Sequence, residues 1–262
     1  MDKKYAYESR IVCFIDILGF SNLIKSTIDK SNEGVKNLNN ICQALNLIDF
    51  FRKIMSEKLP IEDVKTTQFS DSLVISFPWN ENDNSILTAF MTIKYMQIYL
   101  IKEHNMLMRG GIVIGNVIHD NQLIVGPAMI AAYQLESKCA VSPRIVIDPK
   151  VSYRYKQVLK KQSEGEWIDN NIIHKDSDDT SYIDYFNFDP KDNMFSGQEK
   201  LEYFKQLCKI VAANVDSSDM SIRIKYLWMR NKIKGSALYK QPDYIAAYKE
   251  IVTKKNKSSK TK

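Results

Sequence analysis

Two acidic residues occupy positions where a carboxylate can hold a metal ion. Asp16 ends the apolar segment of residues 10–16 (RIVCFID), and Asp71 lies at a tight turn between two further apolar segments. A carboxylate beside a protein core is unfavourable unless it is paired, exposed or bound to a cation. Two such groups brought together repel each other, and a divalent ion between them removes the repulsion. Mg²⁺ suits this place because it accepts a few carboxylates and leaves room for phosphate oxygens.

Each acid alone also has an ordinary structural explanation, Asp16 as a helix N-cap and Asp71 as a turn residue. The neighbouring segments favour the chemical interpretation. Residues 17–21 (ILGFS) predict a glycine-containing turn from a strand into a helix, whose backbone N–H groups suit phosphate. Residues 108–115 (MRGGIVIG) predict a strand with an arginine near its start and interior glycines, which often mark the close approach of a ligand or another backbone.

The elements that must position these residues follow from apolar periodicity. Within residues 8–150 the pattern predicts alternating strands and helices, which favours an α+β fold with helices packed on a sheet. Strands are expected at residues 10–16, 65–69, 72–77, 106–117, 123–126 and 144–148. Helices are expected after a cap at Ser21 or Asn22, then over 37–58, over a long segment ending near His104, and over 127–138.

The remainder of the chain predicts a mostly helical extension. Residues 151–198 are polar and irregular, with a strand expected at 182–188, and helical patterns follow at 199–214, 219–234 and 242–253. We therefore divide the chain into a core of residues 1–150 and an extension of the same domain over 151–253. Residues 254–262 are expected to be a disordered basic tail.

Composition narrows the function classes. The tail contributes five lysines and no acid, so residues 1–253 carry only +1 of the net charge of +6, which argues against a nucleic-acid partner. The sequence contains no run of 18 apolar residues and no apolar signal segment at its start, so no membrane anchor is expected. Four dispersed cysteines without a CxxC pair fit a reducing cytoplasm and no zinc site.

Four motifs together resemble those of class III adenylyl and guanylyl cyclases. Residues 14–20 (FIDILGF) resemble the first metal motif of that family, and residues 69–72 (FSDS) resemble the second. Residues 107–115 resemble the family's Arg-x-Gly-Ile-x-x-Gly strand, and residues 126–136 resemble the helix over the triphosphate. The resemblance covers residues 10–148 and implies a ferredoxin-like, antiparallel-rich palm sheet.

The departures from the family pattern concern the base and the transition state. Ile130 and Gln134 stand where those cyclases carry an Asn and an Arg. Thr67 and Leu123 replace the purine-selecting Lys and Asp, so the usual purine pocket is absent. The amino-acid sequences of residues 126–148, 176–186 and 225–232 resemble those of the pyrimidine cyclases of bacterial Pycsar anti-phage systems.

This second resemblance implies an enzyme that cyclises UTP or CTP to the 3′,5′-cyclic monophosphate and pyrophosphate. It implies two Mg²⁺ or Mn²⁺ ions per site and a head-to-tail homodimer with active sites at the interface. The implied residues are, for metal, Asp16, Asp71 and the Ile17 carbonyl; for phosphate, Ile17, Leu18, Gly19, Phe20 and Ser21; for cationic assistance, Arg109 and Arg144; for the base, Thr67, Phe69 and Tyr133.

Several alternatives remain open at this point. The chain could be a catalytically silent relative that binds nucleotide, as Ile130 and Gln134 suggest, or a purine cyclase. A diguanylate cyclase or polymerase could also place two acids on a comparable sheet, but the sequence lacks a Gly-Gly-Asp/Glu-Glu-Phe motif. A nucleic-acid-binding module would have to act through the C-terminal lysines.

Overall fold

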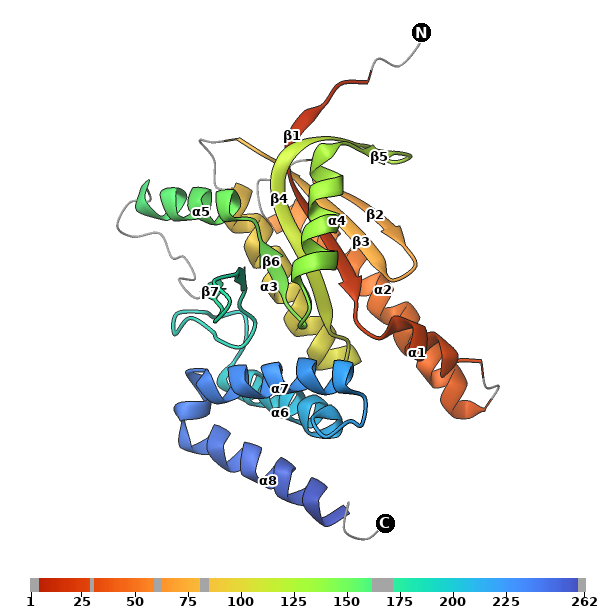
Figure 1. Cartoon of the computed structure of the whole chain (residues 1–262), viewed down its shortest axis with the longest axis vertical. Helices are drawn as coiled ribbons and strands as arrows, with labels where there is room; N and C mark the ends of the chain where they lie inside the picture. Colours follow the sequence, from red (N-terminus) through yellow and green to blue (C-terminus); the bar gives the residue numbers. More distant parts are fainter. Residues whose placement is uncertain (1–4, 29–30, 59–62, 81–84, 162–171, 259–262) are drawn as a thin grey trace.

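The computed structural model describes residues 5–28, 31–58, 63–80, 85–161 and 172–258. Strands and helices alternate through the first part of the chain, and helices dominate the last part (Figure 1). The strands are β1 (Glu8–Ile17), β2 (Lys65–Phe69), β3 (Ser72–Pro78), β4 (Met108–His119), β5 (Ile124–Val125), β6 (Ile145–Ile147), β7 (Ile173–Lys175) and β8 (Ser181–Ile183). The α-helices are α1 (Phe20–Lys25), α2 (Asn32–Lys58), α3 (Ser85–His104), α4 (Pro127–Cys139), α5 (Pro149–Lys161), α6 (Gly197–Asn214), α7 (Met220–Gly235) and α8 (Pro242–Ser258).

The strands form one mixed sheet. Its order is β2-β3-β1-β4-β6-β8-β7, and β5 pairs with the end of β4. The β4–β6 pair is parallel, whereas the other described pairs are antiparallel. The predicted α+β class and the antiparallel-rich sheet are therefore confirmed.

Successive residues of β1 point to opposite faces of the sheet, because side chains alternate along a strand. Ile11, Cys13 and Ile15 join the large core that α2 and α3 help to form. Val12 and Phe14 join a smaller cluster with residues of α4 on the other face. Asp16 continues this second series, so its side chain belongs to the α4 face of the sheet.

Glycine allows α4 to lie directly on β4. A Cβ atom at Gly111 would stand 2.5 Å from the Ala132 carbonyl oxygen and 2.8 Å from the Leu135 Cβ. Neither atom can move away without shifting α4 as a whole. The interior glycine therefore marks the close approach of another backbone, one of the two explanations that strand glycines have.

The C-terminal helices form a layer below the sheet in the view of Figure 1. α6 contacts α3, α7 and α8, which confirms the predicted helical extension. Helix α5 was not predicted, although Val151, Tyr155 and Val158 have helical spacing and are buried. The strand expected at 182–188 is limited to β8.

Two expected boundaries also differ. Gly19, with a left-handed φ of 76°, is the N-cap of α1, so neither Ser21 nor Asn22 has that role. Helix α8 continues to Ser258, five residues past its expected end at residue 253, and residues 259–262 lie outside the described part. Within the described residues, no helix is both long and apolar enough to cross a lipid bilayer.

Candidate active site

The sheet brings Asp16 and Asp71 together. Asp16 lies near the end of β1, where it pairs with Ser72 of β3 and Arg109 of β4. Asp71 occupies the turn between β2 and β3, and its carbonyl oxygen accepts a hydrogen bond from the Ile17 N–H at 3.1 Å. Ser70 adopts a left-handed φ of 55° that tightens this turn. A central strand and a neighbouring hairpin thus converge on one pair of carboxylates.

The electrostatics of Asp16 reflect this convergence. Partial burial raises the pKa of the Asp16 carboxyl above its usual value, and the neighbouring Asp71 carboxyl raises it further. The Arg109 guanidinium acts in the opposite direction but does not cancel the increase in this pKa. Cation binding between the acids would relieve both the repulsion and part of the desolvation.

The donor set fits a hard divalent ion. In the described ranges, no three His, Cys, Asp or Glu side chains gather at one possible metal site. Asp16 and Asp71 therefore offer two carboxylates, to which backbone carbonyl oxygens such as that of Ile17 can add. Mg²⁺ is commonly held by one or two carboxylates and completes its octahedron with water and substrate phosphates. Zn²⁺, by contrast, prefers a closed set of nitrogen and sulfur ligands.

Arg109 lies between Asp16 and a third acid. Its Nε donates a hydrogen bond to Asp16 Oδ2 at 2.9 Å, and Glu136 Oε1 of α4 lies at the same distance from this nitrogen. Burial raises the pKa of Glu136, while Arg109 lowers it. Sequence reasoning missed Glu136. The available signal was its spacing of four from Ala132 and eight from Ala128, which are the buried residues of α4.

The predicted phosphate loop is only partly open. The Leu18 N–H donates to the Leu107 carbonyl oxygen at 2.8 Å, and the Ile17 N–H is bonded to Asp71. These two amides are therefore not available to a phosphate, contrary to the prediction. The N–H groups of Gly19, Phe20 and Ser21 bond no acceptor in the described part of the chain.

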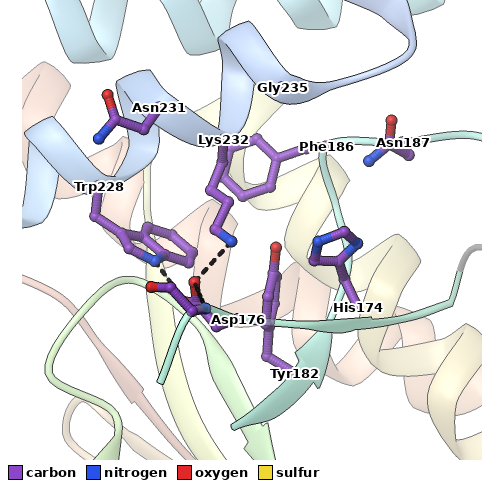
Figure 2. A pocket seen from close by; sticks show the side chains of 10 residues that line it. His174, Asp176, Tyr182, Phe186, Asn187, Trp228, Asn231, Lys232 and Gly235 are labelled. Carbon is purple, nitrogen blue, oxygen red and sulfur yellow. Dashed lines mark hydrogen bonds and ion pairs between the residues drawn. The ribbon is translucent and has the colours of Figure 1, made fainter. Parts of the chain in front are cut away.

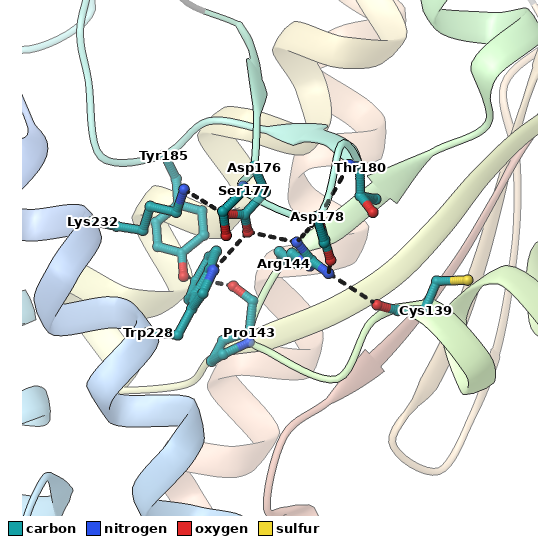
Figure 3. A network of polar contacts seen from close by, with 10 residues as sticks. All are labelled: Cys139, Pro143, Arg144, Asp176, Ser177, Asp178, Thr180, Tyr185, Trp228 and Lys232. Atoms are coloured by element: carbon teal, nitrogen blue, oxygen red, sulfur yellow. Dashed lines mark hydrogen bonds and ion pairs between the residues drawn. The ribbon is translucent and has the colours of Figure 1, made fainter.

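Arg144 has a structural environment that argues against the predicted phosphate contact. Its guanidinium is buried, and it donates to Asp176 Oδ2 and Asp178 Oδ2, each at 2.5 Å (Figure 3). A further bond reaches the Cys139 carbonyl oxygen at the end of α4. Because these bonds anchor β6 to the segment before β8, we do not include Arg144 in the candidate site.

The three residues expected at a base pocket lie on β2 and α4 and differ in their exposure and contacts. Phe69 is 81% exposed at the end of β2. Tyr133 is half-exposed on α4. Its ring is nearly perpendicular to that of Phe14, and the two ring centroids are 5.4 Å apart. The Thr67 hydroxyl bonds to Nε2 of His119 at 3.0 Å, and burial lowers the pKa of this histidine to about 4.

A pocket of about 330 Å³ lies in the extension, between α7 and the β7–β8 region (Figure 2). Asp176 at its wall accepts hydrogen bonds from Trp228 Nε1 and Arg144, and it pairs with Lys232 at 2.7 Å. These opposite charges neutralise one another. The pocket therefore lacks the excess of acids over cations that distinguishes the end of β1, where Asp16 and Asp71 share Arg109 as the nearest cation.

Comparison with known proteins gave similarities among solved structures alone. No protein-family model matches the sequence, and no curated protein matches it. The chain is similar to the guanylyl cyclase domain of the RhoGC fusion protein from the aquatic fungus Blastocladiella emersonii, with 16% identity and a TM-score of 0.48. This match covers 68% of this chain and 95% of that one.

Two further structures illustrate the range of similar proteins. The adenylyl cyclase CyaB from P. aeruginosa has 14% identity and a TM-score of 0.48 over 74% of this chain and 100% of its own. A class III adenylyl cyclase-like ATP-binding protein from P. aeruginosa has 13% identity and a TM-score of 0.41 over 87% of this chain and 45% of its own. All three structures are similar to this chain at a sequence identity of 16% or less.

Proposed function

We propose that this protein is a nucleotidyl cyclase that converts UTP or CTP to the 3′,5′-cyclic monophosphate and pyrophosphate. The observation that carries this proposal is the convergence of Asp16 and Asp71 at the end of β1, with Arg109 beside them. The four sequence motifs that resemble class III cyclases support the same reaction.

The proposed mechanism assigns a role to each group near the acids. Asp16, Asp71 and the Ile17 carbonyl would hold two Mg²⁺ or Mn²⁺ ions. Bound there, the ions would lower the pKa of the ribose 3′-hydroxyl and neutralise the triphosphate. Arg109 would place its guanidinium near phosphate oxygens, for which its planar fork is suited. The free amides of Gly19, Phe20 and Ser21 would orient the terminal phosphates.

Pyrimidine selection is supported by what replaces the purine-reading residues. Thr67 stands in place of the lysine, and its hydroxyl is held by His119 instead of reaching a purine edge. His119 is held in turn by Ser76 Oγ at 2.8 Å. Leu123, in place of the aspartate, offers no acceptor. A smaller base with rebuilt contacts fits this set better than adenine or guanine.

A homodimer would complete the site. The α4 face carries exposed apolar side chains, among them Ile130 (59%), Tyr133 (51%) and Val125 (45%), and Phe69 extends from the neighbouring hairpin. A second copy packed head-to-tail on this face would bring Phe69 and Tyr133 near a bound base. We further propose, from the Pycsar resemblance, that the protein is cytoplasmic and makes a second messenger in anti-phage defence.

The test is an incubation of the purified protein with Mn²⁺ or Mg²⁺ and each of ATP, GTP, CTP and UTP, with products identified by mass spectrometry. Asp71→Asn is the matched control, because it keeps the shape of the side chain and removes its charge. A cyclic pyrimidine product that is absent from the control supports the proposal. A cyclic purine would identify a purine cyclase. If no nucleotide yields a cyclic product, the silent nucleotide-binding relative suggested by Ile130 and Gln134 is the better reading.

A further inference from the structure

One N–H group faces two carboxylates at the candidate site. The Nε of Arg109 carries a single hydrogen and lies 2.9 Å from both Asp16 Oδ2 and Glu136 Oε1. The hydrogen bond goes to Asp16. Glu136 Oε1 is buried and has no hydrogen-bond partner, although it lies at ion-pair distance from the same nitrogen. The Arg109 Nε–H is therefore already bonded to Asp16, while Glu136 Oε1, at the same distance, accepts no hydrogen bond.

The location of Glu136 makes this arrangement specific. Glu136 is 3% exposed, and the close contact of α4 with β4 at Gly111 fixes its backbone above the sheet. Burying a carboxylate is unfavourable unless a donor or a counter-charge satisfies it. Arg109 provides the charge in this state but gives its Nε proton to Asp16. A small rotation of the guanidinium would transfer that hydrogen bond to Glu136, because both carboxylate oxygens already lie 2.9 Å from Nε.

We propose that Glu136 is a positioning residue, which accepts the Arg109 hydrogen bond in place of Asp16 when a divalent ion binds Asp16 and Asp71. This inference rests on the proposed metal site at Asp16 and Asp71 and extends it. Arg109 serves as an internal counter-cation for Asp16 while no metal ion is bound. Glu136 then retains the displaced guanidinium beside the site, where it can approach the phosphates.

The electrostatics favour such an exchange. An arginine that stays hydrogen-bonded to Asp16 competes with an incoming cation for the same oxygen and repels it. When Glu136 receives the guanidinium, Asp16 Oδ2 becomes free and the charge of Arg109 is balanced by another carboxylate. Metal affinity should therefore depend on Glu136 through Arg109, and less through the bare negative charge of Glu136.

The test is a double-mutant cycle on Mn²⁺ binding, measured by titration calorimetry on the purified full chain without nucleotide. The variants are Glu136→Gln, Arg109→Gln and the double variant, with Glu202→Gln at an exposed position of α6 as the control. We expect Glu136→Gln to weaken Mn²⁺ binding about tenfold in the wild-type background and by less than twofold in the Arg109→Gln background. Glu202→Gln should leave the affinity unchanged.

Two outcomes would overturn the inference. If Glu136→Gln weakens Mn²⁺ binding equally in both backgrounds, Glu136 acts through its own negative charge and not through Arg109. If it has no effect in either background, Glu136 has no part in metal binding. Asp16→Asn distinguishes these failures from failure of the proposed function. If wild type does not bind Mn²⁺, or if Asp16→Asn still binds it, the proposed metal site itself is wrong. Should Glu136→Gln not fold, Glu136→Asp shortens the side chain while keeping its charge, and the same cycle then decides.

Discussion

The backbone N–H of Ile17 donates to the backbone carbonyl oxygen of Asp71 across 3.1 Å. The residue that follows Asp16 is therefore bonded to the residue that supplies the second carboxylate. This bond fixes the spacing of the acids through the backbone, independently of either side chain. Replacing one carboxylate should for this reason change the chemistry of the site much more than its geometry.

The two acids should affect turnover much more than stability. We expect both Asp16→Asn and Asp71→Asn to lower the proposed cyclase turnover at least a hundredfold, because each removes a proposed metal ligand. Asp71→Asn should leave stability unchanged or raise it slightly, since it removes a charge that repels Asp16. Asp16→Asn should change stability by less than about 1 kcal/mol, because burial disfavours the charged form of Asp16 and Glu136 Oε1, 2.9 Å from Arg109 Nε, can accept the hydrogen bond. Urea unfolding measures both changes, and near-wild-type turnover in either variant would contradict the metal assignment.

Gly111→Ala tests the contact of α4 with β4. The added Cβ would meet the Ala132 carbonyl oxygen at 2.5 Å, so α4 must shift. We expect a loss of about 1–3 kcal/mol in unfolding free energy, together with reduced turnover, as overpacking predicts. Gly197→Ala at the start of α6 is the matched control, since nothing lies within 4 Å of its added Cβ. Equal stability of the two variants would show that this contact is looser than described.

His119 should make the stability of the fold depend on pH. Burial, followed by the charges of Arg10 and Lys65, lowers the pKa of His119 to about 4, whereas an unfolded histidine titrates near 6.5. The unfolded chain therefore gains a proton first as the pH falls, and stability is lost between about pH 6.5 and 4.

His119→Gln should remove this contribution. We expect the decrease in unfolding free energy between pH 7 and pH 5 to be smaller in the variant by about 1 kcal/mol, a value reduced for solvent screening. Denaturant unfolding of both proteins at the two pH values measures it. Parallel pH profiles would mean that His119 already titrates normally in the folded protein.

Arg144→Gln separates a structural role from a phosphate contact. The buried guanidinium bridges Asp176 and Asp178, so its loss should destabilise the fold by about 3 kcal/mol. The KM for the nucleotide should stay within about twofold of wild type at a temperature where the variant is folded. A stable variant with a KM raised tenfold or more would restore Arg144 to the phosphate site.

The sequence was most informative where local pattern and tertiary structure agree. Apolar runs and helical spacing predicted most strands, though not β7, and most helices. A strand-end acid followed by a glycine turn marked the position of Asp16. The role of Arg144 could not be predicted, because a basic residue at a strand start looks the same whether it meets a phosphate or a carboxylate. Its partners, Asp176 and Asp178, lie more than thirty residues away in an irregular segment.

Glu136 and helix α5 illustrate a different difficulty. The significance of Glu136 depends on the approach of α4 to β4, which brings it to Arg109 from 27 positions away. Helix α5 has strong helical spacing, but its many lysines and polar residues gave residues 149–161 the appearance of a surface loop. Both features depend on contacts between segments that sequence periodicity does not describe.

The parallel pairing of β4 with β6 limits how far the chain can be reduced. The Arg144 carbonyl oxygen accepts a hydrogen bond from the N–H of Gly110, the residue after Arg109, at 3.2 Å, while the Arg144 side chain is held by Asp176 and Asp178. A chain shortened to residues 1–150 would keep both acids but would leave a buried guanidinium without counter-charges one strand from Asp16. The C-terminal part thus stabilises the sheet that carries the acids, and a shorter fragment that folds by itself would have to extend past Asp178.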